Sequence, residues 1–286
     1  MGLLKLHLLV DLDETLVYRT EETKESLPTP PNDMFFVEAA GLYVKIRPYT
    51  FEFLESMAKH YEMTVVTLGG ARYAEMIVKQ LDPDQKFFGG RVIARDKLVD
   101  LHSKTKNLAK FFPGNMQHTA IIDDRVDVWD NLDQVVQVLP YHYSVDEEEE
   151  EGDVLAHMEH VLLEAHRRFH ARYRNSAREA DMQEVIRGLQ RVILRGMTVA
   201  LTGLPRSVRA DCKEMLQRFG ARVRWKITDK TTIVICDAST VMQADRENIP
   251  VLIVNWIREL ALKWRKPRFD RFLLATTFCS SQECAN

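Results

Sequence analysis

The chain has 286 residues, 45% of them hydrophobic and 28% charged, which is long enough for two ordinary domains of a globular protein. The first apolar run is interrupted by Asp11 and Asp13, and no apolar stretch reaches the length of a membrane helix, so we expect neither a secretory signal nor a membrane anchor but an intracellular protein. The four cysteines form no CxxC pair and have no histidine pair at zinc-ligand spacing, which argues against a disulfide scaffold or a zinc site.

The net charge of −3 is unevenly divided along the chain. Residues 1–151 carry 16 Lys and Arg against 27 Asp and Glu, whereas residues 152–286 carry 23 against 15. Two halves that attract each other would account for this difference. A basic surface that attracts an acidic or phosphorylated ligand would account for it equally well.

The first half alternates apolar runs with helical patterns, which predicts a mostly parallel sheet with helices on its faces. A polar, proline-rich stretch at residues 20–33 predicts a loop. The predicted strands are Leu6–Val10, Tyr43–Ile46, Met63–Thr67, Arg91–Ala94, Thr119–Ile122 and Val135–Val138, and the predicted helices are Thr50–His60, Arg72–Gln80 and Lys104–Phe111.

An acidic run, Asp146–Gly152, separates this half from the rest, and we interpret it as a solvated hinge because its like charges repel each other. Residues 153–192 have helical patterns that meet near Asn175–Ser176. A second α/β pattern begins at Gly196, with strands in "MTVALTG", "TTIVICD" and "VLIV" and helices in "SVRADCKEMLQRFG" and "NWIRELALKW". The predicted divisions are therefore a first domain over 1–148, a hinge and helical linker over 149–190, a small second domain over 191–280 and a tail over 281–286.

Acidic and hydroxyl side chains follow three of the predicted strands directly. Asp11 and Asp13 follow the first, Thr67 ends the third, and the pair Asp123–Asp124 follows the strand "HTAII". The carboxyl ends of parallel strands meet at one edge of a sheet, so these side chains should gather there. Two acidic pairs would repel each other without a cation between them, and hard oxygen ligands suit Mg²⁺.

The spacing Asp11-x-Asp13 suggests a division of labour in phosphoryl transfer. One carboxylate would attack phosphorus, and the other would protonate the leaving oxygen and then activate water. Lys106, in a polar stretch that begins a predicted helix, would supply positive charge to the phosphate, and Thr67 a hydroxyl. Taken singly, each feature has a structural explanation: a turn or helix cap, a strand-end hydroxyl, a surface lysine, a salt-bridged turn. Their ordered occurrence favours chemistry.

These residues carry a resemblance to a known family. "DLDETLV" at 11–17 resembles the signature of haloacid dehalogenase-like phosphatases, and residues 46–83, 106–113 and 121–129 resemble the branch acting on the C-terminal repeats of RNA polymerase II. "IIDDRVDVW" is similar to its TFIIF-associating subfamily. Residues from "LRGMTVALTGLP" to "NWIRELALKW" resemble a BRCT domain, an arrangement that the same subfamily shows. The implied fold is a Rossmann-type parallel sheet domain, a helical linker and a small α/β BRCT domain.

The resemblance also implies roles for individual residues. Asp11 is the expected nucleophile and Asp13 the general acid and base. Mg²⁺ is expected on the Asp11 carboxylate, the Asp13 backbone carbonyl and Asp124, with Asp123 close by or acting through water. Thr67 and Lys106 would contact the phosphoryl group. The residues expected near the substrate are Arg47, Asp82, Arg95 and Arg125, for which salt bridges are an equal alternative; Trp129 and Trp256 are expected in the core.

Two departures from the resemblance have consequences. Gly70 stands where the subfamily usually has threonine, which affects hydrogen bonds beside Thr67. Thr202 and Gly203 would offer a hydroxyl and an amide to a phosphate, but "ASTVMQADREN" lacks the lysine that phosphopeptide-binding BRCT domains use. We therefore expect the BRCT domain to act as a scaffold.

Three functions follow. The first is a nuclear, Mg²⁺-dependent phosphoserine/phosphothreonine phosphatase of the polymerase II repeats, for which we expect transcription factors of the polymerase II machinery as further partners and no direct nucleic acid binding. The second is the same chemistry on another phosphoprotein or a small phosphate ester. The third is a binding module on an inactive phosphatase fold, which the intact acidic set disfavours.

Overall fold

The computed structural model describes residues 4–98, 102–105, 108–112, 116–130, 133–143, 148–177, 180–236 and 249–274. The chain divides into two compact units, Met1–Arg187 and Gly188–Asn286, which are described separately below. This division falls inside the predicted linker, and the finer domain limits given above stay predictions. No helix in the described ranges is long and apolar enough to cross a membrane.

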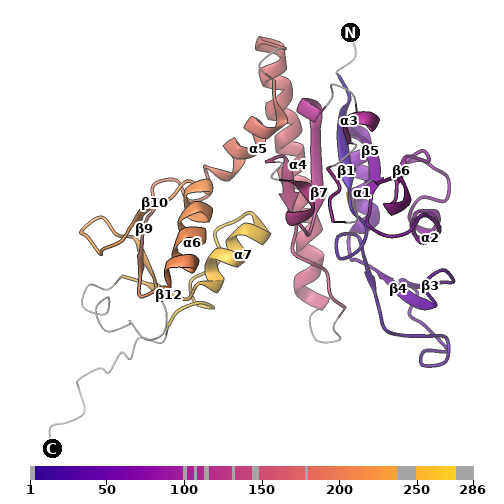
Figure 1. Cartoon of the computed structure of the whole chain (residues 1–286), viewed down its shortest axis with the longest axis horizontal. Helices are drawn as coiled ribbons and strands as arrows, with labels where there is room; N and C mark the ends of the chain where they lie inside the picture. The colour runs from indigo at the N-terminus through magenta and orange to yellow at the C-terminus, as the bar shows by residue number, and fades with distance from the viewer. Residues whose placement is uncertain are drawn as a thin grey trace, which may run out of the picture. The chain divides into compact units, whose positions relative to one another are not determined.

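The first unit is built on a five-stranded sheet in which every neighbouring pair is parallel, as predicted (Figure 1). Its apolar strands are buried almost throughout, which is typical of a parallel sheet covered on both faces. In spatial order the strands are β6 (Val92–Ile93), β5 (Tyr61–Val66), β1 (Leu6–Val10), β7 (Thr119–Asp123) and β8 (Val135–Gln137).

The strand predicted at Tyr43–Ile46 does not join this sheet. It is β4 (Leu42–Ile46), the middle strand of a small antiparallel sheet with β2 (Val17–Arg19) and β3 (Met34–Val37). Neither β2 nor β3 was expected, because three or four residues give too short an apolar pattern to recognise. The prediction of a loop over residues 20–33 is confirmed, since no helix or strand is present there.

Helices cover the parallel sheet and continue into the linker region. The helix α1 (Thr50–His60) has the predicted bounds, and α2 (Ala71–Leu81) differs by one residue at each end. The prediction of a helix from Lys104 is wrong at its start, because α3 spans Leu108–Phe111 only. The acidic run is partly helical, since α4 (Glu148–Asn175) begins within it, and α5 (Met182–Gln190) follows. Among the described residues, the short 3-10 helices are η1 (Arg95–Lys97), η2 (Met116–His118) and η3 (Asp127–Trp129).

The two faces of the parallel sheet have different coverings. Phe53, Leu54 and Met57 of α1 are fully buried, and α1 packs against both β5 and α4. A separate apolar cluster joins Leu9 of β1 to Leu108 of α3 and to residues of neighbouring strands and loops. The sheet is thus buried between layers.

The second unit is a four-stranded parallel sheet in the order β10 (Arg222–Arg224), β9 (Thr198–Thr202), β11 (Ile233–Cys236) and β12 (Val251–Leu252). The helices α6 (Arg206–Arg218) and α7 (Asn255–Lys263) pack on it, with Trp256 fully buried as predicted. Gly220, which follows α6 at a φ of +94°, has no room for a Cβ because one would lie 2.0 Å from the Arg191 carbonyl oxygen. The segment "ASTVMQADREN" lies outside the described residues.

Within the first unit, α4 contacts α1 through hydrogen bonds and through a histidine seam, the packed rings of His60, His166 and His170. Glu159 accepts hydrogen bonds from Tyr49 and Ser56 at 2.8 and 2.6 Å, and the rings of His60 and His170 lie 4.9 and 4.4 Å from that of His166. Burial, followed by the nearby histidines, lowers the pKa of His166 from 6.5 to about 4. At a pH between these two values, His166 is therefore mostly neutral in the folded protein and mostly protonated in the unfolded chain.

We expect acid to weaken this seam. Because the folded pKa of His166 is lowered, the unfolded chain binds more protons between about pH 6.5 and 4, and stability falls as the pH drops through that window. The midpoint of thermal unfolding should fall between pH 7.5 and 5.5, and by less in His166→Asn. His160 is an exposed histidine on the same helix, and the His160→Asn variant should show the same fall in the unfolding midpoint as wild type. Identical pH dependence in wild type and His166→Asn would contradict this account.

Candidate active site

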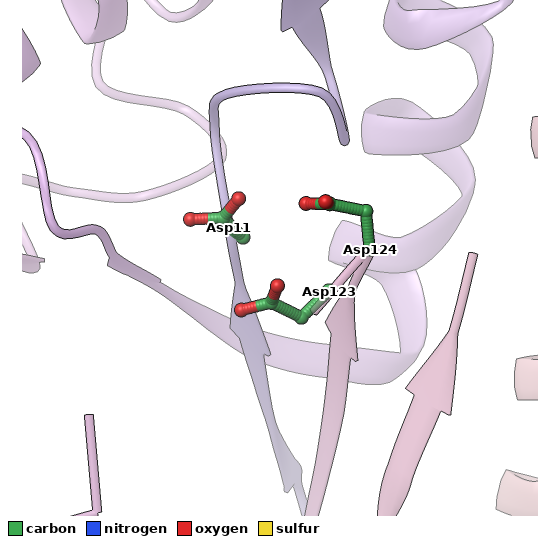
Figure 2. Close-up of side chains that lie close together, drawn as sticks. All are labelled: Asp11, Asp123 and Asp124. Carbon is green, nitrogen blue, oxygen red and sulfur yellow. The ribbon is translucent and has the colours of Figure 1, made fainter. Parts of the chain in front are cut away.

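The acidic residues predicted from separate strands do meet at one edge of the parallel sheet. Asp11 follows β1 directly, and Asp123 ends β7, which is the neighbour of β1. One ligand oxygen from each of Asp11, Asp123 and Asp124 lies within 4.8 Å of the others (Figure 2). All three residues are buried, at 5%, 0% and 6% exposure, so their charges are not dispersed into solvent.

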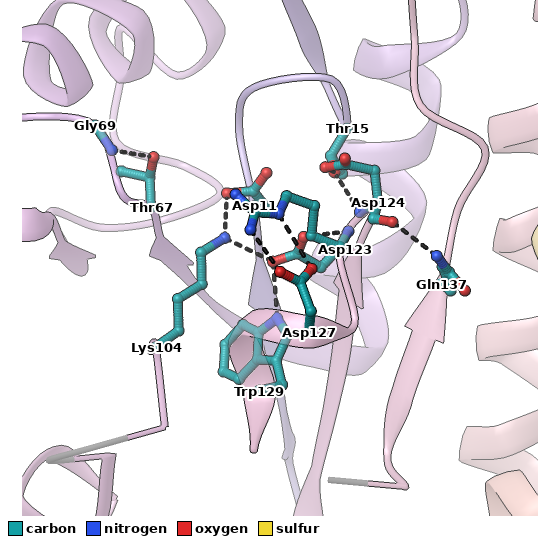
Figure 3. A network of polar contacts seen from close by, with 11 residues as sticks. Asp11, Thr15, Thr67, Gly69, Lys104, Asp123, Asp124, Asp127, Trp129 and Gln137 are labelled. Atoms are coloured by element: carbon teal, nitrogen blue, oxygen red, sulfur yellow. Dashed lines mark hydrogen bonds and ion pairs between the residues drawn. The ribbon is translucent and has the colours of Figure 1, made fainter. Parts of the chain in front are cut away.

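A lysine that the sequence analysis did not select neutralises two of these carboxylates. The Lys104 Nζ atom lies 2.6 Å from Asp11 Oδ1 and 2.6 Å from Asp123 Oδ2 (Figure 3). Burial opposes its charge, but the two carboxylates outweigh burial and raise the pKa of Lys104. The side chain is therefore a fixed ammonium group in the site. Lys106, which was expected in this role, lies outside the described residues.

Both carboxylate oxygens of Asp123 accept hydrogen bonds from protein groups. Its Oδ2 atom accepts from the Trp129 indole at 2.8 Å as well as from Lys104, and its Oδ1 atom accepts from the Arg125 backbone N–H at 2.8 Å (Figure 3). Trp129 is fully buried as predicted, but it also has this polar role. Asp123 is thus better suited to hold Lys104 than to ligate a metal directly.

Asp124 is held at the site by the loop after β1. The Thr15 hydroxyl donates to Asp124 Oδ1 at 3.2 Å and accepts from the Asp124 backbone N–H at 3.1 Å. The Gln137 amide on β8 donates to the Asp124 carbonyl at 2.9 Å. Burial first, and then the charges of Asp123 and Glu14, raise the pKa of Asp124 to about 7. A further positive charge beside Asp124 would favour its ionised form.

The donor set fits a hard divalent cation such as Mg²⁺. Asp11 Oδ1 is bonded to Lys104 and Asp124 Oδ1 to Thr15, whereas the second oxygen of each carboxylate accepts no hydrogen bond from a described residue. Burial raises the pKa of Asp11, Lys104 opposes that rise, and Asp123 and Asp13 add to it. A cation on the two free oxygens would favour both ionised forms.

Asp13 has a different environment from Asp11. Its Oδ1 atom accepts a hydrogen bond of 2.5 Å from the phenol of Tyr73, on the first turn of α2. Burial raises the pKa of Asp13 against the effect of this bond. Gly69 leaves space for the tyrosine ring, since a Cβ there would lie 2.9 Å from Tyr73 Cδ1. The two carboxylates of the DxD motif therefore differ in partner, as a nucleophile and an acid would require.

Thr67 ends up where the strand pattern placed it. It follows β5, is 1% exposed and accepts the Gly69 backbone N–H on its hydroxyl at 2.9 Å. Its hydroxyl hydrogen is then free to donate elsewhere. Gly70 is followed by α2 and has room for a side chain, because a Cβ there would meet its nearest neighbour, Arg95 Nη2, at 3.5 Å.

The four residues expected near the substrate divide into two groups. Arg47 is 1% exposed, and its guanidinium donates to the carbonyl of Thr15 at 3.1 Å, so it holds the loop that carries the DxD motif. Asp82 accepts the backbone N–H groups of Phe87 and Phe88 at the end of α2, about 16 Å along that helix from Ala71. The structure therefore does not bring Asp82 together with the site aspartates.

The other two lie at the strand ends. Arg95 follows β6, and its backbone N–H donates to the Gly69 carbonyl at 3.0 Å, which places it beside the Thr67 turn. Arg125 follows Asp124 and forms an exposed pair with Asp127. Both arginines are at the carboxyl edge of the sheet, where a bound phosphate ester would extend.

The residues that sequence reasoning missed share one property. Lys104, Tyr73 and Thr15 act through partners far away in the chain, and Trp129 donates to a carboxylate six residues before it; a motif read along the chain shows none of these contacts. Lys104 had one usable signal, because it is one of two lysines in "HSKTKN" and either could face the site. Tyr73 had another, a polar aromatic residue one turn into the helix after Thr67.

Comparison with known protein families gives two matches. Residues 6–170 match the NLI interacting factor-like phosphatase family, and residues 190–261 match the BRCA1 C Terminus (BRCT) domain. The first match covers every site residue described above.

Individual relatives and one solved structure are similar to this chain in the same regions. The chain is 30% identical to an RNA polymerase II C-terminal domain phosphatase of Caenorhabditis elegans over 94% of its own length and 46% of that protein, and 40% identical to the human phosphatase of the same name over 49% of its own length and 15% of that protein. The chain thus spans less than half the length of these relatives. The solved structure of Fcp1, an essential RNA polymerase II CTD phosphatase, is similar with a TM-score of 0.76 at 24% identity, covering 95% of this chain and 96% of that one, which shows the shared fold.

Proposed function

The chain belongs to the NLI interacting factor-like phosphatase family and carries a BRCT domain, and from this premise we propose that it is a Mg²⁺-dependent protein serine/threonine phosphatase that works through an aspartyl phosphate. The observation that carries the proposal is the buried convergence of Asp11, Lys104 and Asp124 at the carboxyl edge of the sheet, next to a second carboxylate, Asp13, held by a phenol.

In the first step, a carboxylate oxygen of Asp11 attacks phosphorus, and the bond between phosphorus and the serine oxygen breaks. The proton on Asp13 moves to that oxygen, so that the product leaves as neutral serine. The Tyr73 phenol donates to Oδ1, so the transferable proton of Asp13 is on Oδ2. Burial, and then the Asp13 carboxylate, raise the pKa of Tyr73, which keeps the phenol a donor.

In the second step, water attacks the aspartyl phosphate, and Asp13 accepts a proton from it. The acyl phosphate bond breaks at phosphorus, inorganic phosphate leaves, and Asp11 is free again. Lys104 offsets the negative charge of Asp11 and of the phosphoryl oxygens throughout, because its ammonium is fixed by Asp123. The Thr67 hydroxyl and the arginines Arg95 and Arg125 are the proposed contacts of the phosphate and of the flanking substrate.

Asp11 and Asp124 would hold Mg²⁺ through their free oxygens, together with the Asp13 backbone carbonyl that the resemblance implies. When bound, Mg²⁺ would offset the charge of the phosphate and align it for in-line attack.

The proposed substrate is the set of phosphorylated C-terminal repeats on the largest chain of RNA polymerase II, and the proposed location is the nucleus. The names of the relatives support this choice, and the active-site chemistry alone does not distinguish it from another phosphoprotein or a small phosphate ester. The test is hydrolysis of tail peptides, each phosphorylated at one defined serine, beside an unrelated phosphopeptide. Preference for one or more tail peptides supports the proposal, whereas equal hydrolysis of the unrelated peptide contradicts the polymerase substrate.

Substituting the proposed acid should separate two kinds of substrate. Asp13→Asn should lower turnover of a phosphoserine peptide by about 10²–10⁴-fold, because the serine oxygen needs a proton to leave. Turnover of an aryl phosphate should fall less, since a phenolate can leave without receiving a proton. Steady-state kinetics on both substrates measure the difference, and equal losses would count against the acid role of Asp13.

Removing the phenol that orients Asp13 should have a smaller effect of the same kind. Tyr73→Phe should lower kcat on phosphoserine by about tenfold, within the range for a lost hydrogen bond to a charged group. The pKa of Asp13 should rise without this donor, so the alkaline limb of the pH–rate profile should move to higher pH. Tyr49→Phe, which removes the phenol bonded to Glu159, is the matched control and should leave kcat and the profile unchanged. An unshifted profile in Tyr73→Phe would argue for a purely structural role.

A further inference from the structure

An exposed tryptophan marks a surface of the BRCT unit that the phosphatase chemistry does not use. Three of the four tryptophans are buried, but Trp225, directly after β10, is 49% exposed. Two cations of α6 lie over its ring, with Arg209 Cζ at 5.7 Å and Lys213 Nζ at 5.8 Å from the ring centroid. The ring is therefore held in place and open to a ligand on its free side.

The strand that leads to this tryptophan has an open edge. β10 pairs with β9 on one side, and no described residue pairs with its other side. The Arg222 backbone N–H donates to the Met197 carbonyl at 2.9 Å. The backbone N–H and C=O groups of Arg222 and Arg224 therefore point toward β9. In a parallel ladder the residue between them, Val223, turns its N–H and C=O toward the free edge. An extended peptide could pair with these groups as an additional strand.

Cations lie on both faces of this edge. Arg222 and Arg224 are exposed and share the sheet face of Ala200, whereas Val223 and the two cations of α6 belong to the opposite face. None of the four cations, Arg209, Lys213, Arg222 and Arg224, lies within 4.0 Å of a carboxylate in the part of the chain that the structure describes. Arg209 donates from Nη2 to the Leu204 carbonyl at 2.7 Å, a neutral partner, and its Nε is buried with no hydrogen-bond partner among the described residues. The edge thus carries positive charge that its own neighbours leave uncompensated.

We propose that the free edge of β10, with Trp225, binds an extended Asp- and Glu-rich segment of a partner protein as an added strand. The side chains of an added strand alternate between the two faces of the sheet, and cationic side chains of the BRCT unit lie on both faces. An apolar side chain of the segment would cover the Trp225 ring. The inference rests on the BRCT unit alone and is independent of the phosphatase activity.

Two other ligands fit this surface less well. A phosphate group is best bound by donors that converge on one point, whereas these cations are spread over opposite faces of the strand. Single-stranded RNA could bind the cations and stack on the ring, but it could not pair with the peptide groups of Val223 as a β-strand does. Charges along an edge strand also guard against aggregation, but protection gives no reason to leave a large aromatic ring exposed.

Trp225 supplies its own signal for a binding test on the full chain. The probe is an octapeptide of glutamates with one central phenylalanine, so that an added strand presents carboxylates to both faces of the sheet; its partner probe has glutamine in place of every glutamate. Tryptophan fluorescence is followed during each titration, first at low and then at high salt. We expect saturable binding of the acidic probe, at least tenfold weaker binding of the neutral probe, and weakening by salt.

Three variants separate strand addition from simple charge attraction. Val223→Pro removes the N–H of the free edge without removing a ladder bond, and the double change Arg222→Glu with Arg224→Glu reverses charge on one face; each should weaken binding at least tenfold, measured with a fluorescent label on the probe. Trp225→Ala should weaken it as well. Arg258→Glu, an exposed arginine on α7, is the control and should bind as wild type does. Thermal unfolding shows which variants are folded.

Some results would overturn the proposal. Equal binding of the acidic and neutral probes would exclude charge recognition, and full binding by the folded charge-reversal variant would exclude this edge. A single-stranded oligouridine that binds more tightly than the acidic probe, and equally in Val223→Pro, would replace a peptide partner with a nucleic acid.

Discussion

Asp11→Asn is expected to lower turnover of a phosphoserine peptide by at least about 10⁴-fold, because an amide oxygen cannot take the phosphoryl group and the other residues of the site cannot replace a nucleophile. The asparagine keeps the size of the buried side chain, and its oxygen can still accept the Lys104 hydrogen bond. The loss should therefore appear in kcat without unfolding of the chain, as checked by single-turnover kinetics and thermal unfolding.

Asp84→Asn is the matched control for this change. Asp84 is an exposed aspartate after α2, and its substitution should leave kcat unchanged. Residual turnover in Asp11→Asn above about one-hundredth of wild type, in a preparation free of contaminating phosphatase, would contradict the assignment of Asp11 as the nucleophile.

Lys104→Met is expected to damage both stability and activity. The ammonium lies 2.6 Å from two buried carboxylates, and removing one partner of a buried charge cluster typically costs about 3–5 kcal/mol because the others are left unpaired. For a unit of this size, such a loss lowers the midpoint of thermal unfolding by about 6–20 °C. Turnover should fall by about 10²–10³-fold, since a fixed cation on the phosphoryl oxygens is lost.

Two comparisons make this result interpretable. Lys86→Met removes an exposed lysine that pairs with Glu55 on the surface, and it should change stability by less than about 1 kcal/mol. Mg²⁺ should stabilise Lys104→Met more than wild type, because a divalent cation can neutralise the carboxylates left unpaired. A Lys104→Met variant as stable and active as wild type would contradict the role assigned to this lysine, and normal activity would point back to Lys106.

The parts of the fold that the sequence predicted are those with strong local patterns. The strand Leu6–Val10 and the helix Thr50–His60 have the predicted bounds, because a run of buried apolar residues and a helical spacing of such residues are visible along the chain. The antiparallel sheet of β2, β3 and β4 was missed, since its short strands are held by pairing with each other. The start of α3 was misplaced because Lys104 is fixed by contacts with Val128, Asp11 and Asp123, none of which is local.

The same distinction applies to the site. Asp11, Thr67 and Asp123 were found because each follows a recognisable strand, and the topology of a parallel sheet brings strand ends together. Arg47 and Asp82 were grouped with them by resemblance, but the structure shows both bonded to backbone groups of loops. The hydrogen bonds from Tyr73 and Trp129 depend on how rings pack in three dimensions, which no spacing along the chain encodes.

The central claim is that Asp11 becomes phosphorylated during turnover. Its most direct test is to quench the full chain during hydrolysis of a phosphoserine peptide with Mg²⁺, reduce the acyl phosphate with borohydride, and locate the modified aspartate by peptide mass spectrometry. The account predicts conversion of Asp11 to homoserine, only with substrate and Mg²⁺ present, and none in Asp11→Asn. Modification of Asp13 or Asp124 instead, or turnover with no modified aspartate at any quench time, would contradict it.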